Sequence, residues 1–266
     1  MIKPLRRAAR RLLEVTGLIG PYYRWVEGRL ARTDSPPVDD GRPMPPPDLL
    51  VAVAGGAGQA WFSERGQADA AKFLRLAAGA GLETDGRLDV LDWGCGSGRI
   101  ARWLAPDIVA RGGRFTGCDL NGKAVAWCQA NLPGRYFTND LKPPLPLEAE
   151  RLDLVYAHSV LTHLTEDTAA AWLAEVARVL RPGGCALLSF HDEVYAEAFG
   201  PPEVVRQLGG QRYVVWNNAL EGSNYLSAWT TRAHLAELAA PYFDVLEILP
   251  GKAAEPEQAV AVLRAR

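Results

Sequence analysis

The stretch DVLDWGCGSGRIARWL, residues 89–104, decides the fold. A short apolar run, 88–93, ends in a turn with glycine at three alternate positions, and a helical pattern, 98–111, follows. Glycine has no Cβ, so a ligand can approach the main chain of such a turn directly. The first N–H groups of the following helix are also free to bind a ligand. The stretch therefore predicts a ligand site at the end of the first strand of an open α/β sheet.

Strand-like and helical segments alternate from this turn to the end of the chain. Further strands are expected at 114–119, 135–140, 152–158, 185–190, 243–249 and 258–265. Further helices are expected at 122–132, 166–180 and 231–242. The near-continuous apolar character of the first five strands indicates a mostly parallel sheet with helices on both faces. The last two strands are joined by a short link and predict an antiparallel hairpin at the sheet edge, which makes seven strands in all.

The residues before this α/β region suggest a separate arm. The sequence LRRAARRLLEV, 5–15, predicts a basic helix, and six prolines between residues 36 and 47 predict a stiff, extended connector. We therefore expect an N-terminal arm over 1–47 and one domain over 48–266. Within that domain, the less regular segment 194–230 is interpreted as an insertion or lid.

The charge of the arm leaves its role open. Residues 1–32 contain eight Lys or Arg against two Glu. Such a helix can lie on an anionic membrane surface, which would make the protein peripheral to the membrane. The interpretation we prefer is that it packs on the domain or on a partner, because Arg is abundant throughout the chain.

Composition argues against several classes of function. The net charge is -2, and the body of the chain has no run rich in Lys and Arg, so nucleic acid is not an expected partner. The four cysteines form no C-x-x-C pair, so no metal is expected, and free thiols fit a reducing cytosol. No apolar run reaches the roughly 18–20 residues that span a bilayer. We therefore expect a cytoplasmic protein.

The spacing of the glycine turn discriminates between cofactors. A dinucleotide site uses G-x-G-x-x-G, whereas Asp92, Gly94, Gly96 and Gly98 form D-x-G-x-G-x-G. An acidic residue beside the turn is a poor neighbour for a diphosphate. It is a good neighbour for a ligand that carries an ammonium or sulfonium charge.

Two further acids follow successive strands. Asp119 ends the second strand, 21 residues after Gly98, where a carboxylate can accept hydrogen bonds from both ribose hydroxyls. Asp140 ends the third strand and could face an adenine edge, although a turn or capping residue is an alternative for it. Three acids at the ends of three successive strands, beside a glycine turn, indicate a nucleoside ligand.

Over about residues 60–266, this pattern resembles the class I S-adenosylmethionine-dependent methyltransferases. The matching stretches, in chain order, are VLDWGCGSGR, FTGCDL, FTNDLKPPLP, LDLVYAHSVLTHL and VLRPGGCALLSF. The resemblance implies a Rossmann-like seven-stranded sheet. It also implies S-adenosylmethionine as the cofactor and S-adenosylhomocysteine as the product.

The resemblance also implies which residues surround each part of the cofactor. Those around the methionine part would be Asp92, Gly94, Cys95, Gly96 and Gly98. Those around ribose and adenine would be Asp119, Leu120, Asn139, Asp140 and Leu141. Those that close the pocket after the fourth strand would be Ala157, His158 and Ser159.

Methyl transfer to a hydroxyl benefits from a general base. The candidates are His163 and His191, each with the alternative of a structural or solvated histidine, which we prefer for His163. The absence of an Asn-Pro-Pro-Tyr signature at 157–159 argues against a planar base nitrogen or a glutamine amide as the acceptor. Aromatic residues outside the shared core are candidates for binding a small-molecule acceptor: Trp61, Phe62, Trp216 and Tyr225.

The hypothesis at this point is a methyltransferase that acts on a small molecule, with a hydroxyl of a metabolite, sugar or lipid-linked compound as the acceptor. A non-catalytic nucleoside-binding module within a larger assembly is one alternative. An NAD-dependent oxidoreductase is another, disfavoured by the glycine spacing. The oligomeric state is left open.

Overall fold

The structure is a computed structural model that describes residues 13, 16, 18–32 and 36–266. The basic helix predicted over 5–15 lies, apart from Leu13, outside the described residues. Within the part of the chain that the structure describes, no helix is both long enough and apolar enough to cross a bilayer.

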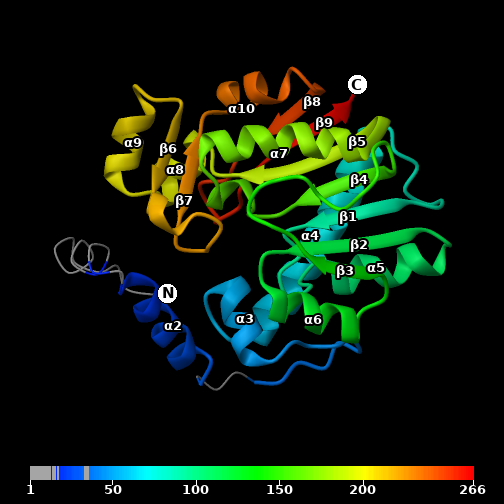
Figure 1. The fold of residues 1–266 in the computed structure, drawn as a ribbon, viewed down its shortest axis with the longest axis horizontal. Helices are drawn as coiled ribbons and strands as arrows, with labels where there is room; N and C mark the ends of the chain where they lie inside the picture. Colours follow the sequence, from blue (N-terminus) through cyan, green and yellow to red (C-terminus); the bar gives the residue numbers. More distant parts are fainter. Residues whose placement is uncertain (1–12, 14–15, 17, 33–35) are drawn as a thin grey trace.

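The core of the molecule is a seven-stranded sheet with the order β3-β2-β1-β4-β5-β9-β8 (Figure 1). Its strands are β1 Asp89–Trp93, β2 Arg114–Asp119, β3 Arg135–Thr138, β4 Leu152–Ala157, β5 Leu180–Phe190, β8 Phe243–Leu249 and β9 Ala259–Ala265. The first five are parallel, and β9 is antiparallel to both of its neighbours, β5 and β8. This confirms the predicted mostly parallel sheet with a C-terminal antiparallel hairpin.

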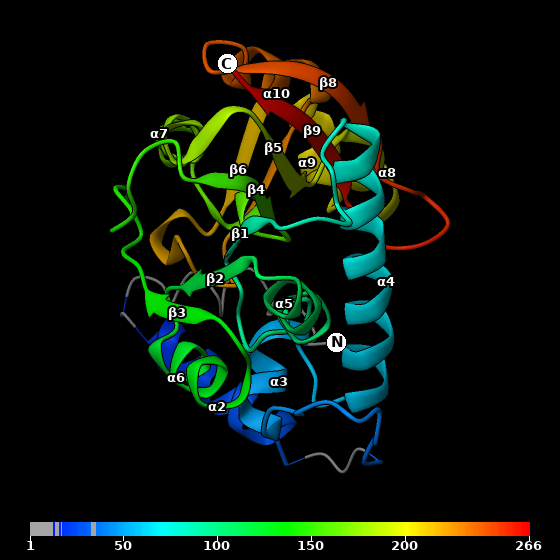
Figure 2. The same ribbon diagram turned by 90° about the vertical axis from the view of Figure 1, so that its right-hand side faces the viewer.

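Helices cover both faces of the sheet. They are α4 Gln59–Gly79, α5 Ala101–Ala110, α6 Gly122–Asn131, α7 Glu166–Val179 and α10 Arg232–Ala239. One buried cluster contains residues of α4, α5 and α6, and the cluster on the other face contains residues of α7 and α10. Figure 2 shows α4 and α5 on one side of the sheet and α7 on the other.

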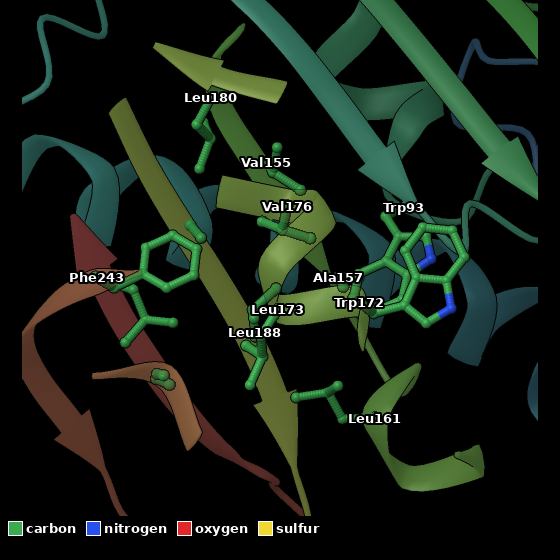
Figure 3. Close-up of a cluster of buried hydrophobic side chains, with 14 of the residues drawn as sticks. Trp93, Val155, Ala157, Leu161, Trp172, Leu173, Val176, Leu180, Leu188 and Phe243 are labelled. Carbon is green, nitrogen blue, oxygen red and sulfur yellow. The ribbon is translucent and has the colours of Figure 1, made fainter. Parts of the chain in front are cut away.

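Helix α7 shows how the sequence pattern becomes packing. Its buried residues Ala169, Trp172, Leu173, Val176 and Val179 recur at helical spacing, so they form one apolar stripe that faces the sheet. Figure 3 shows the result, in which the Trp172 ring lies against Trp93 of β1. The two ring centroids are 4.7 Å apart in a stacked arrangement.

The largest difference from the predicted boundaries lies at the start of the fifth strand. We expected helix 166–180 to end at the Pro-Gly-Gly run and the fifth strand to begin at Cys185, but α7 ends at Val179 and β5 begins at Leu180. Leu180 already pairs with Leu152 of β4, and the register shifts before the pairing continues at Leu154 and Cys185. The Pro-Gly-Gly run is therefore an irregularity within the strand.

The segment expected to form an insertion or lid has its own small structure. It contains α8 Glu193–Phe199, α9 Pro202–Leu208, β6 Tyr213–Trp216, the 3-10 helix η2 Asn218–Leu220 and β7 Ser227–Thr230. Strands β6 and β7 form a separate antiparallel pair. Their shared apolar cluster is centred on Val204, Val214 and Trp229.

The N-terminal region contains α2 Ile19–Leu30, residues 36–46 without regular structure, and α3 Pro47–Ala54. The proline-rich connector is anchored to the domain through Asp40. Both carboxylate oxygens of Asp40 accept hydrogen bonds from the guanidinium of Arg102, at 2.8 and 2.6 Å. The side chain of Arg102 is fully buried and also donates to the carbonyl of Pro43, 2.9 Å away. The connector is thus part of the packed structure and is not a free spacer.

Candidate cofactor and acceptor site

A cavity of about 540 Å³ lies beyond the carboxyl ends of the central strands. This volume is within the usual range of small-molecule sites. Fourteen of the residues singled out from the sequence line it: Trp61, Asp92, Gly94, Cys95, Gly96, Asp119, Leu120, Asn139, Asp140, Leu141, His158, Ser159, His163 and Tyr225. The fold therefore brings together side chains that are spread over most of the chain.

The glycine turn adopts a backbone conformation that only glycine accepts easily. Gly94, Gly96 and Gly98 have φ values of +78°, +51° and +78°. A Cβ on Gly94 would lie 2.2 Å from Cγ2 of Val160, so crowding forbids a side chain there as well. The amides of Gly94 and Cys95 donate to the carbonyl of Cys118 in β2, at 2.8 and 3.0 Å, which holds the turn against the sheet.

Asp119 is fixed at the end of β2 by the same turn. Its Oδ2 accepts from the amide of Gly96 and its Oδ1 from the amide of Asn121, each at 2.8 Å. Burial raises the pKa of this carboxyl, while these backbone hydrogen bonds lower it. A carboxylate has about four acceptor positions, so two remain for donors in the cavity. A ribose diol offers two such donors.

Asp92, in β1, is only 3% exposed yet lines the cavity. Burial, reinforced by the nearby charge of Asp119, raises its pKa to about 7. A cation bound beside Asp92 would favour the ionised carboxylate and lower this pKa. Asp92 is therefore suited to a ligand that carries positive charge.

The side of the cavity near β3 offers an unused acceptor. Asn139 donates from its amide nitrogen to the carbonyl of Asp140 at 2.8 Å. Its Oδ1 is buried and has no hydrogen-bond partner among the described residues. Leu141 is held by its carbonyl, which accepts from Nε1 of Trp172 at 2.8 Å. An exocyclic amine of a base could satisfy the free oxygen of Asn139.

His163 presents an unprotonated nitrogen at neutral pH. It ends the 3-10 helix η1, Leu161–His163, and its Nδ1 lies 2.7 Å from the carbonyl oxygen of Leu226. Since a carbonyl only accepts, Nδ1 carries the proton and donates. Burial lowers the pKa of His163, so the ring is neutral and its Nε2 remains an acceptor.

The other two histidines near the site are also neutral. Burial lowers the pKa of His158 to about 4, although Asp69 lies 3.4 Å from its Nε2. Burial lowers the pKa of His191 to about 3. The ring of His191 stacks on Tyr195 with centroids 4.3 Å apart, and its Nδ1 lies 3.2 Å from the carbonyl of Ala228.

Five of the predicted site residues do not line this cavity: Phe62, Gly98, Ala157, His191 and Trp216. Phe62 and Ala157 are fully buried in the protein interior. A Cβ on Gly98 would meet Leu132 at 2.6 Å, so this glycine faces the end of α6. Trp216 packs in the apolar cluster of the insertion, and His191 contacts the insertion through Ala228 and Trp229. These five residues therefore lie outside the cavity wall, and their contact with the ligand stays a prediction.

Several residues that line the cavity were not predicted from the sequence, among them Glu27, Arg99, Tyr195 and Gln258. Arg99 directly follows the glycine turn, so its position gave a usable signal. Gln258 accepts from the Ser189 hydroxyl at 2.7 Å and donates to the hydroxyl of Ser159. Gln258 is distant in sequence from Ser159 and Ser189, and the pairing of β9 with β5 brings it to them.

Comparison with known proteins agrees with this geometry. Residues 90–184 match a family model described as a methyltransferase domain. A phthiotriol/phenolphthiotriol dimycocerosates methyltransferase of Mycobacterium ulcerans is 38% identical over 103 residues, which are 37% of this chain and 35% of that protein. A fatty-acid O-methyltransferase of Mycolicibacterium smegmatis is 36% identical over 97 residues, 36% of this chain and 34% of that protein. The matched region thus spans only about a third of these two relatives.

Solved structures show the same fold. An S-adenosylmethionine-dependent methyltransferase from Mesorhizobium loti superposes with a TM-score of 0.55 at 21% identity and covers 73% of this chain and 96% of that one. The Burkholderia thailandensis 1,6-didemethyltoxoflavin-N1-methyltransferase, solved with S-adenosylhomocysteine, has a TM-score of 0.54 at 21% identity over 78% of this chain and 81% of that one. The family model over residues 90–184, together with the sheet order and the glycine turn, identifies this part of the chain as a methyltransferase domain of the class I S-adenosylmethionine-dependent type, and the solved structures share its fold.

Proposed function

We propose that the protein transfers a methyl group from S-adenosylmethionine to a hydroxyl of a small-molecule acceptor. The observation that carries the proposal is the neutral imidazole of His163, which lines the same cavity as the glycine turn and Asp119. Bound S-adenosylmethionine supplies an activated methyl group, and methylation of a hydroxyl releases one proton.

The lining residues divide the cavity between cofactor and acceptor. Asp92 and the glycine turn suit the charged methionine part, Asp119 suits the ribose, and the free oxygen of Asn139 suits a base amine. The remaining wall contains Trp61, His163 and Tyr225 from α4, η1 and the insertion, together with the charged side chains of Glu27 and Arg99. Its aromatic part suits the apolar portion of an organic acceptor.

His163 is the residue best suited to take up the released proton. Its hydrogen bond to Leu226 fixes the ring in the tautomer whose Nε2 is free. A positioned base of this kind contributes about 10²–10⁴-fold to the rate. Two relatives are named for dimycocerosates and for fatty-acid O-methylation, which supports an oxygen acceptor on a lipid-like molecule.

The proposal is tested with S-adenosylmethionine carrying a ¹³C-labelled methyl group, incubated with extract of the source cell. The carbon chemical shift of the labelled product identifies the methylated atom. With that acceptor, His163→Gln should lower kcat by about 10²–10⁴-fold and leave the Kd of S-adenosylmethionine unchanged. His191→Gln is the matched control and should keep kcat. A labelled methyl group attached to nitrogen in the product, or a loss of kcat with His191→Gln alone, would overturn the proposal.

A further inference from the structure

We propose that the outward face of α2, formed by Leu18, Pro21, Trp25, Gly28, Arg29 and Arg32, docks on an anionic lipid surface at the entrance of the acceptor site. Only one consequence of the docking rests on the proposed function, namely that the acceptor comes from that lipid surface. The docking itself is argued from the exposure and charge of α2.

The exposed face of α2 is apolar where a solvent-facing helix is normally polar. Leu18 and Trp25 are 52% and 58% exposed, and they lie seven residues apart, hence on one side of the helix. Pro21 and Gly28, between and beyond them, are exposed as well. A large exposed aromatic residue next to apolar neighbours marks a binding surface, and Trp favours the boundary between water and lipid.

The charges of this region complement an anionic surface. Arg29 and Arg32 are exposed beside Trp25, and the guanidinium of Arg29 lies 5.0 Å from the centroid of the Trp25 ring. Residues 1–32 carry eight Lys or Arg against two Glu. Each basic residue near an anionic leaflet contributes about 1 kcal/mol to binding. A neutral or basic protein partner would not account for this excess.

The one acidic residue of α2 is turned away from this face. Glu27 lines the cavity and accepts a hydrogen bond from the Tyr225 hydroxyl at 2.5 Å. The ring of Tyr23 stacks on that of Tyr225 with centroids 3.7 Å apart. Helix α2 thus joins the acceptor side of the cavity on one face and presents Leu18 and Trp25 on another. Figure 1 shows α2 at the periphery of the molecule, beside α3.

The arrangement of α2 has a functional consequence. An amphiphilic acceptor leaving a bilayer on which α2 lies would reach the cavity beside Tyr225 without crossing bulk water. The Glu27–Tyr225 hydrogen bond and the Tyr23–Tyr225 stack connect α2 to the cavity wall along this path.

Co-sedimentation of the full chain with vesicles tests the docking. The vesicles are phosphatidylcholine alone or with one quarter phosphatidylglycerol, and the comparison is made between wild type, Leu18→Ala/Trp25→Ala and Tyr242→Ala/Leu246→Ala. The control pair is 39% exposed at each position and belongs to the far end of the chain, near α10 and in β8. Wild type and control should bind the anionic vesicles, and the α2 variant should bind roughly tenfold more weakly.

Two results would overturn the docking proposal. One is equal partition of the wild type into both kinds of vesicle, and the other is undiminished binding by the α2 variant. Titration with S-adenosylmethionine in the absence of vesicles tests cofactor binding by itself. It therefore distinguishes failure of the docking proposal from failure of the proposed function. Leu18 and Trp25 do not line the cavity, so the α2 variant should retain the cofactor affinity of the wild type whatever the vesicles show.

Discussion

Replacing Asp119 with Asn tests the placement of the ribose directly. Asp119 uses one oxygen for the amide of Gly96 and the other for the amide of Asn121. Asparagine offers a single oxygen, so one backbone amide loses its acceptor even before a ligand binds. Of the two acceptor positions that the carboxylate keeps for a diol, one is lost and the other is no longer charged. Both effects change the contacts of Asp119 beside the glycine turn, where Gly96 donates to it.

The expected loss follows from these contacts. Two charge-assisted hydrogen bonds to ribose are together worth roughly 2–4 kcal/mol. At about 1.4 kcal/mol per factor of ten, the Kd of S-adenosylmethionine should rise about 30- to 1,000-fold. The maximum rate at saturating cofactor should fall much less, because Asp119 does not hold the acceptor.

Isothermal titration calorimetry at pH 7.5 measures this change. Asp107→Asn is the matched control, since it makes the same chemical change at an exposed position of α5. Far-UV circular dichroism establishes that both variants are folded. A Kd for Asp119→Asn within threefold of the wild type would refute the ribose assignment.

Three other predictions concern the same region and its support. Burial raises the pKa of Asp92 to about 7, so its carboxyl is mostly neutral at pH 6 and mostly ionised at pH 7.5. If only the ionised form attracts the positive charge of S-adenosylmethionine, the affinity for S-adenosylmethionine, measured by titration, should rise about eightfold from pH 6 to pH 7.5. Asp92→Asn should abolish this rise. Arg102→Ala leaves Asp40 without its buried partner and should lower the free energy of unfolding in urea by about 3–5 kcal/mol; a change below about 1 kcal/mol would contradict the anchoring of the connector. Gly94→Ala should abolish cofactor binding through its clash with Val160, and Val160→Ala in the same chain should restore binding only in part, because the positive φ remains; full restoration would show that crowding alone requires the glycine.

The sequence by itself determined the features that depend on neighbouring residues. An apolar run, a glycine turn and an amphipathic helix specify one strand–turn–helix unit, and its repetition specifies the parallel sheet. The acids at the strand ends followed from the same logic, because parallel strands end at one edge. Asp92 and Asp119 are accordingly found together in the cavity wall.

Only the tertiary structure decided which side chains face the ligand. Trp61 and Phe62 are adjacent in α4, but one lines the cavity at 45% exposure and the other is fully buried, because successive helical residues point about 100° apart. Which of the two side chains faces the cavity depends on how α4 is oriented on the sheet, and the residues of α4 alone do not determine this orientation. The same holds for Glu27 and Tyr225, whose hydrogen bond joins segments 198 residues apart. Contacts of that kind arise from the packing of whole elements, and a pattern that extends over a few residues cannot encode them.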